Sequence, residues 1–92
     1  MNLKRKRFLV TGACGTIGSE IVKRLLKSGA TVCAFDSHEN GLFELERELN
    51  SIYKKNLRIF LGDIRNLQRL IKASKDVEFI IHCAALKHVE IS

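Results

Sequence analysis

The sequence predicts an α/β fold in which a parallel sheet of about four strands carries helices on both faces. Short apolar runs alternate along the chain with longer stretches whose apolar residues recur at helical spacing. The connections are short, and the chain contains no proline, low-complexity segment or internal repeat. Apolar strands separated by helices are typical of parallel pairing with right-handed crossovers. The 92 residues are enough for one small domain.

A glycine-dense turn joins the first strand to the first helix. The strand is expected at about Arg7 to Thr11, and residues 12–18 read Gly-Ala-Cys-Gly-Thr-Ile-Gly. The helix is expected from about Gly15 to Ser28 and to stop at Gly29, because glycine commonly ends helices. Its apolar positions at helical spacing are Ile17, Ile21, Val22, Leu25 and Leu26.

This turn has the arrangement that receives the pyrophosphate of a dinucleotide. Gly12 lets the chain turn sharply, Gly15 leaves room for the phosphates, and Gly18 lets the helix pack against the strand. The first amides of the helix are unpaired and carry the positive end of its dipole, so a bound anion is stabilised there. Glycines also mark ordinary turns, and the prediction therefore depends on the strand before, the helix after and an acid on the next strand.

The remaining elements continue the alternation. They are a strand at about Thr31 to Phe35 closed by Asp36, a helix at Asn40 to Tyr53, a strand at Leu57 to Leu61, a helix at Leu67 to Ala73 and a strand at Glu78 to His82. The helix faces expected to be buried carry Leu42, Leu45, Leu49 and Ile52, and Leu67, Leu70, Ile71 and Ala73. Asn66 is a candidate N-cap. We expect the strand order 3-2-1-4, with a nucleotide over the carboxyl ends beside the first strand.

Two aspartates lie at that edge. Asp36 can accept hydrogen bonds from the adenosine ribose hydroxyls and would repel a 2′-phosphate, which favours NAD over NADP. His38 and the basic surface leave NADP open, and a plain turn residue is the alternative for Asp36. Asp63 can accept from the adenine amino group while Ile64 packs on the ring, although an Asp that caps the following turn fits the spacing equally.

The net charge of +6 raises the question of nucleic acid. The basic runs are residues 4–7 and Lys54-Lys55, and no aromatic residues interleave with them. Each run precedes a predicted strand, where solvated charge is common, and a basic rim that attracts a nucleotide is the simpler interpretation. We therefore expect no nucleic-acid partner.

Targeting and redox features are sparse. No apolar stretch approaches the roughly 20 residues that span a bilayer, and the apolar run after the basic start is too short for a signal peptide. The three cysteines form no Cys-x-x-Cys pair, which predicts a reducing cytoplasm and no metal site. Cys33 and Cys83 are expected in apolar strands as small core residues, Cys14 lies in the turn, and none is expected to be catalytic.

At this point the sequence resembles the extended short-chain dehydrogenase/reductases. The resemblance is carried by residues 11–18, by Asp63-Ile64-Arg65 and by residues 81–89, which read Ile-His-Cys-Ala-Ala-Leu-Lys-His-Val. This last stretch is similar to the UDP-N-acetylglucosamine 4,6-dehydratase branch of polysaccharide and flagellin-sugar synthesis. Residues 36–45 resemble the cytoplasmic domain of larger, membrane-attached members.

The resemblance implies a Rossmann domain that binds NAD, or NADP. Cys83 and Ala84 would line the nicotinamide-side ribose and pyrophosphate, and Lys87 would reach the cofactor or the substrate entrance, unless it is a solvated turn lysine. His82 and His88 are expected to be structural. The complete set of expected cofactor-binding residues is Gly12, Cys14, Gly15, Thr16, Ile17, Gly18, Asp36, Ser37, His38, Asn40, Asp63, Ile64, Cys83, Ala84, Ala85 and Lys87.

The reaction implied is oxidation of the sugar at C4, elimination of water across C5 and C6, and return of hydride to C6. It needs a tyrosine base with a lysine four residues on. The sole tyrosine is Tyr53, and Leu57 stands four residues after it. We therefore expect residues 1–92 to be the N-terminal portion of the NAD(P)-binding domain, without the catalytic and substrate portion, and expect no dehydratase turnover from them alone.

Three further expectations concern partners and alternatives. A nucleotide sugar would be a partner of the full-length enzyme only. The apolar strand near residue 80 would be an uncovered edge through which the chain self-associates. A stand-alone dinucleotide-binding or regulatory module is the alternative function, and a nucleic-acid binder a more distant one.

Overall fold

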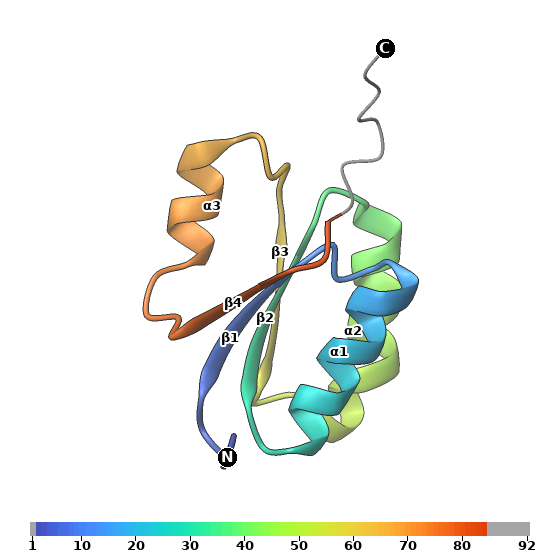
Figure 1. The fold of residues 1–92 in the computed structure, drawn as a ribbon. Coiled ribbons are helices and arrows are strands. Elements are labelled where there is room, and N and C mark those ends of the chain that lie inside the picture. Colours follow the sequence, from blue (N-terminus) through green and yellow to red (C-terminus); the bar gives the residue numbers. More distant parts are fainter. Residues whose placement is uncertain (1, 85–92) are drawn as a thin grey trace.

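Four strands and three helices alternate in the computed structural model, which describes residues 2–84 (Figure 1). The strands are β1 Arg7–Thr11, β2 Thr31–Asp36, β3 Leu57–Leu61 and β4 Phe79–His82. The helices are α1 Thr16–Lys27, α2 Glu39–Tyr53 and α3 Leu67–Ala73. The apolar periodicity and the turn residues therefore predicted the elements to within a residue or so at their ends.

The strands form one parallel sheet in the order β3-β2-β1-β4, as predicted. In its middle, Leu9 of β1 lies beside Cys33 of β2 and Ile80 of β4. Parallel pairing places all the strand starts at one edge, called here the amino edge, and all the strand ends at the carboxyl edge. The loops after β1, β2 and β3 consequently gather at the carboxyl edge.

The helices divide between the two faces of the sheet, with α1 and α2 on one face and α3 on the other (Figure 1). Because side chains alternate along a strand, Val10 and Ala34 join the larger core cluster with Val22 of α1 and Leu42 of α2. The smaller cluster, on the α3 face, consists of Leu9, Cys33, Phe35 and Ala73.

Several apolar residues expected in the core are exposed instead. Ile52 of α2 is 70% exposed, and in α3 Leu67 and Ile71 are 66% and 61% exposed. Helical spacing identifies residues that share a face but not whether another element covers that face, and among residues 2–84 nothing covers these three.

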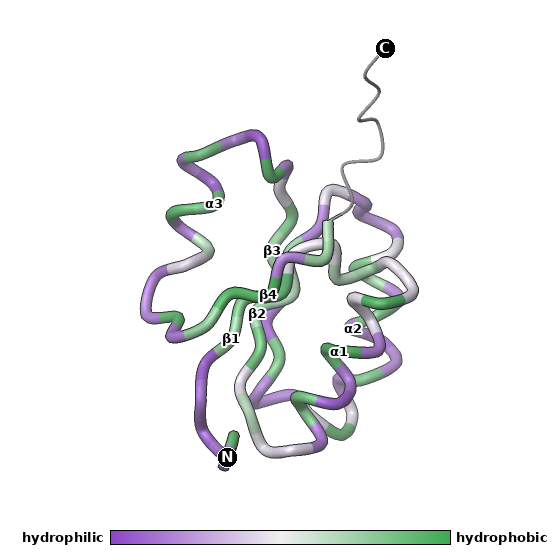
Figure 2. Tube along the Cα trace, in the orientation of Figure 1, coloured by the Kyte–Doolittle hydropathy of each residue, from purple (hydrophilic) through white to green (hydrophobic). Residues whose placement is uncertain are grey.

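Strand β4 also departs from the expectation of strands buried on both faces. It is an edge strand, and its Phe79 and Ile80 are 38% and 56% exposed. Figure 2 shows it as a hydrophobic segment at the side of the sheet. The prediction of an apolar edge strand is therefore confirmed. Cys33 is buried as predicted, whereas Cys83 follows β4 and is half-buried against the larger cluster.

Candidate functional site

The loop after β1 comes very close to the end of β4. Gly12 has a φ of +70°, and a Cβ atom placed on it would lie 2.6 Å from the backbone nitrogen of Ala84. The amide of Cys83 donates to the carbonyl of Thr11 at 3.0 Å, which continues the β1–β4 pairing past the strands. Both the backbone angle and the close approach require glycine at position 12.

Gly18 and Gly15 differ in what they do inside the fold. A Cβ on Gly18 would lie 2.0 Å from the carbonyl oxygen of Gly12, so Gly18 lets α1 pack against the turn that follows β1, whereas the prediction named the strand itself. Gly15 is exposed, has an ordinary φ of −72°, and a Cβ there would lie 3.4 Å from the same oxygen. Neither backbone angle nor internal packing requires glycine at position 15. Its predicted role, room for phosphates, is compatible with this geometry.

The N-terminus of α1 is open. Its N-cap is Gly15, which supplies no side-chain hydrogen bond, and the first turn contains no acidic residue. Within residues 2–84, the amides of Thr16, Ile17 and Gly18 form no hydrogen bond. These three donors and the positive end of the helix dipole therefore point toward the space in front of the turn.

Asp36 connects the loops that follow β1 and β2. Its Oδ2 accepts from the amide of Cys14 at 2.9 Å, and its Oδ1 accepts from the amide of His38 at 3.0 Å. An ionised carboxylate has about four acceptor positions, so Asp36 keeps acceptor capacity for a ligand hydroxyl beyond the two amides and the Cys14 thiol. Burial, followed by the charge of Asp36 and its hydrogen bond, raises the pKa of the Cys14 thiol to about 12. The thiol is thus protonated near neutral pH and is a poor nucleophile.

The start of α2 packs directly against the glycine turn. His38 is the N-cap, and its Nδ1 accepts from the amide of Gly41 at 3.0 Å. A Cβ on Gly41 would lie 2.9 Å from the sulfur of Cys14. Gly41 was missed by sequence reasoning, although a glycine inside an otherwise strong helix pattern is a signal of such a contact. The exposed Ser37 and Asn40 flank this cap.

Asp63 starts the turn that leads to α3. Its Oδ1 accepts from the amide of Arg65 at 2.8 Å, and its Oδ2 lies 2.8 Å from Nη2 of the same arginine. These contacts lower the pKa of Asp63 to about 2. The turn-capping role, which the spacing left open, is therefore present, while Ile64 packs against the smaller core cluster. Arg65 as the partner was not predicted.

His82 is engaged locally, as expected for a structural residue. Its Nδ1 lies 2.7 Å from Oγ1 of the buried Thr11, which joins the ends of β4 and β1. Ala84 lies against Gly12. Three other residues of the sequence predictions, Ala85, Lys87 and His88, are outside the described residues.

The basic runs are not at this edge. Arg7 and Lys55 line one cavity with Thr31 and Leu57, which begin β2 and β3. The interpretation of these runs as a rim around the nucleotide was therefore wrong. The reason is topological, because residues that precede parallel strands all meet at the amino edge, opposite the glycine turn.

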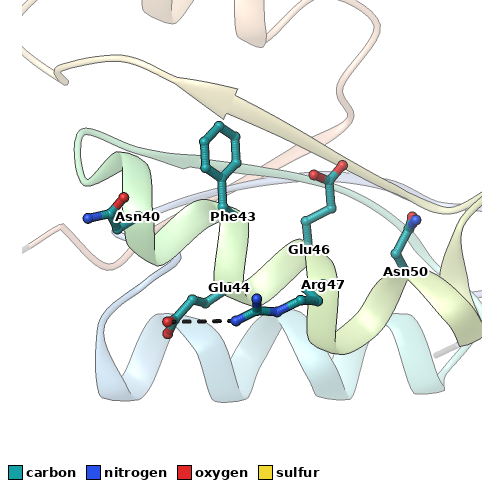
Figure 3. Close-up of a pocket in the computed structure, with 6 residues that line it drawn as sticks. All are labelled: Asn40, Phe43, Glu44, Glu46, Arg47 and Asn50. Atoms are coloured by element: carbon teal, nitrogen blue, oxygen red, sulfur yellow. Dashed lines mark ion pairs between the residues drawn. The ribbon is translucent and has the colours of Figure 1, made fainter.

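A second hollow lies along α2 and is distinct from the glycine turn. Figure 3 shows its six lining residues, all from α2, with Glu44 and Arg47 paired at 3.9 Å. It measures about 490 Å³, and Phe43 is 53% exposed beside it. Of the expected cofactor-binding residues it contains Asn40 alone, so this hollow lies mostly apart from the proposed nucleotide contacts.

None of the helices in residues 2–84 has the length and apolar composition needed to span a bilayer. In that same part of the chain, no three His, Cys, Asp or Glu side chains are grouped as metal ligands.

Known proteins match this chain over nearly its whole length. An uncharacterized membrane protein of Methanocaldococcus jannaschii is 49% identical over 89 residues, which are 96% of this chain and 26% of that protein. The inverting UDP-N-acetylglucosamine 4,6-dehydratase of Campylobacter jejuni serotype O:23/36 is 37% identical over 90 residues, with 95% and 26% covered. The chain thus spans about a quarter of the length of these curated relatives.

Solved structures agree with the sequence matches. The X-ray structure of Pen from Bacillus thuringiensis has a TM-score of 0.88 and 36% identity, covering 97% of this chain and 28% of Pen. A putative short chain dehydrogenase of Shigella flexneri, complexed with NADP, has a TM-score of 0.78 and 25% identity, with 92% and 40% covered. The predicted resemblance to the short-chain dehydrogenase/reductases and to their UDP-N-acetylglucosamine 4,6-dehydratase branch is confirmed. The family model described as polysaccharide biosynthesis protein matches residues 8–92, and the chain belongs to that family.

Proposed function

We propose that this chain is the NAD-binding portion of a nucleotide-sugar enzyme similar to the UDP-N-acetylglucosamine 4,6-dehydratases. The observation that carries the proposal is the open N-terminus of α1 behind Gly15, a glycine for which the fold itself has no need. A side chain at position 15 would occupy the space that phosphates need, so the residues present fit a dinucleotide.

The pyrophosphate would accept hydrogen bonds from the amides of Thr16, Ile17 and Gly18, which have no acceptor within residues 2–84. The remaining acceptor capacity of Asp36 would serve the ribose hydroxyls, and its charge disfavours a 2′-phosphate. This supports NAD as the cofactor. The further contacts expected at Ser37, His38, Asn40, Asp63, Ile64, Cys83, Ala84, Ala85 and Lys87 are part of the same proposal.

Bound NAD would supply a hydride acceptor for oxidation of the sugar at C4. The residues of this chain would hold and orient that cofactor. The 92 residues contain no Tyr-x-x-x-Lys pair, and we place the tyrosine base and the sugar site in the part of the relatives that this chain does not span. Residues 1–92 alone are expected to give no 4-keto-6-deoxy sugar from UDP-N-acetylglucosamine.

Calorimetric titration with NAD and NADP tests the cofactor. We expect saturable NAD binding that Asp36→Ala weakens about tenfold or more, because two hydrogen bonds to a charged group are lost. Glu46→Ala, which removes an acid from the half-buried side of α2, is the matched control and should leave the affinity unchanged. Equal binding of NAD by the wild type and Asp36→Ala, or tighter binding of NADP by the wild type, would contradict the assignment.

Two partner and location proposals accompany this function. Exposed Phe79 and Ile80 on the edge strand support self-association through β4, and light scattering that shows a monomer at high concentration would refute it. Three free cysteines support a reducing cytoplasmic setting. The name of the Methanocaldococcus relative points to a membrane, and fractionation of cells that express the chain decides between the two.

A further inference from the structure

A cavity of about 280 Å³ lies at the amino edge, at the opposite end of the strands from the glycine turn. It forms where β1, β2 and β3 begin and where the loop from α3 to β4 passes them. Its buried apolar lining residues are Phe8, Val32, Cys33 and Leu57. The dinucleotide proposal makes no use of this cavity.

The charge around the cavity is strongly positive. Four of its lining residues, Arg7, Lys55, Arg58 and Lys75, are basic, and Asp76 is its one acid. They come from the starts of β1 and β3, the turn before β3, and the loop before β4. Within residues 2–84 none of the four forms an ion pair, whereas four basic residues outside the cavity do: Lys23, Arg24, Arg47 and Arg65.

The two arginines are held in place before any ligand arrives. Nε of Arg7 donates to the carbonyl oxygen of Asp76, a residue with a φ of 65°. Nη2 of Arg58 lies 3.7 Å from the sulfur of Cys33, and its guanidinium lies 5.9 Å from the centre of the Phe60 ring. Each guanidinium has five N–H donors and uses few of them here. Less side-chain freedom is therefore lost when an anion binds.

The register of the sheet brings these groups to one face. Cys33 pairs with Leu9 and with Arg58, and Arg7 is two residues before Leu9, so all four side chains project from the α3 face. The turn at Asp76 then passes over the start of this face. The two arginines and two lysines that line this one cavity supply the hydrogen-bond donors and the positive charge that a phosphate group needs.

We propose that this amino-edge cavity is a second anion site, which binds a phosphate group separately from the dinucleotide. A soluble phosphate compound and a phospholipid headgroup share this chemistry. The site would give a function to the four basic residues that line this cavity, at the opposite end of the strands from the cofactor turn.

The test is titration of pyrophosphate into the 92-residue chain, followed residue by residue with ¹H–¹⁵N NMR. We expect saturable shifts at residues 55–58 and 75–77, and these should persist in Gly15→Asp, which blocks the glycine turn. Shifts confined to residues 12–18, or lost in Gly15→Asp, would overturn the proposal.

Two variants that each remove one positive charge distinguish a specific anion site from general electrostatic attraction. Arg58→Gln should weaken the amino-edge affinity about fivefold. Lys72→Gln removes the same charge from α3 outside the cavity and should change it less than about twofold. Equal weakening by both variants would overturn the proposal. Thermal unfolding verifies that each variant is folded. If Arg58→Gln does not fold, Lys75→Gln replaces it, because Lys75 lies in an exposed loop.

The two sources of phosphate are distinguished by flotation with phosphatidylglycerol and phosphatidylcholine vesicles. Binding to the anionic vesicles that Arg58→Gln abolishes supports a headgroup, and pyrophosphate binding without vesicle binding supports a soluble ligand. Binding of a single-stranded oligonucleotide that Lys72→Gln weakens as much as Arg58→Gln, with no pyrophosphate shifts, would overturn the site in favour of nonspecific polyanion binding.

Discussion

The three helices of this protein begin in two different ways. α2 and α3 are capped by their own chain, because Nδ1 of His38 accepts from Gly41 at 3.0 Å and Oδ1 of Asn66 accepts from Arg69 at 3.1 Å. The N-cap of α1 is Gly15, which has no side chain to do this. A glycine N-cap is less stabilising than Asn or Asp by only about a few tenths of a kcal/mol, so the open start of α1 costs little and leaves its amides available to an anion. The difference identifies which helix start is available to a ligand.

The largest expected effect on stability comes from adding a side chain at Gly18, where α1 packs against the glycine turn. Gly18→Ala should lower the free energy of unfolding by roughly 3 kcal/mol, because the new Cβ would lie 2.0 Å from the carbonyl oxygen of Gly12. Urea denaturation measures it. Gly15→Ser, whose Cβ has room, is the control and should change stability by less than about 0.5 kcal/mol. Similar losses in both variants would show that Gly15 has an internal role after all.

Giving α1 a cap of its own should separate stability from binding. Gly15→Asp should raise the unfolding free energy by a few tenths of a kcal/mol, since Asp is a better N-cap than Gly. The same change should weaken NAD binding about tenfold or more, because its carboxylate competes for the amides and repels the phosphates. Calorimetry and denaturation on the same samples measure both. Unchanged NAD affinity would place the pyrophosphate elsewhere.

Removing the N-cap of α3 should lower stability and leave NAD affinity unchanged, the opposite of the result expected for Gly15→Asp. Asn66→Ala should cost about 1 kcal/mol of unfolding free energy, because the Arg69 amide loses its acceptor, and should leave NAD affinity unchanged. Asn50→Ala, in the body of α2, is the matched control and should cost less. A fall in NAD affinity with Asn66→Ala would mean that α3 takes part in the site.

The smallest expected effect is the acid dependence of the α3 turn. Arg65 lowers the folded-state pKa of Asp63 from 3.8 to about 2, so its stabilising contribution is present above pH 3.8 and is lost as the pH falls through 2. NMR titration of the carboxyl group should give a midpoint near 2, which returns toward 3.8 in Arg65→Gln. Identical midpoints in the two proteins would show that the ion pair does not persist in solution.

Much of the fold could be predicted because strands, helices and caps depend on residues that are close together in the sequence. Alternating apolar runs and helical spacing gave the elements, and Asn66 gave a correct cap. The candidate site was predicted as a set of loops at one edge, since the ends of parallel strands must meet there. Contacts between residues distant in sequence were not predictable in this way. The approach of Gly41 to Cys14 is an example.

The sequence by itself determined the alternation of strands and helices and the position of the glycine turn after β1, because periodicity and turn chemistry act over a few neighbouring residues. The strand order followed from the arrangement that this turn and alternation are typical of. The tertiary structure alone decided that Gly18 is needed for packing and Gly15 is not, that Ile52 is exposed, and that the basic runs meet opposite the turn. These properties depend on which surfaces face each other after the sheet forms, and spacing along the chain does not contain that information.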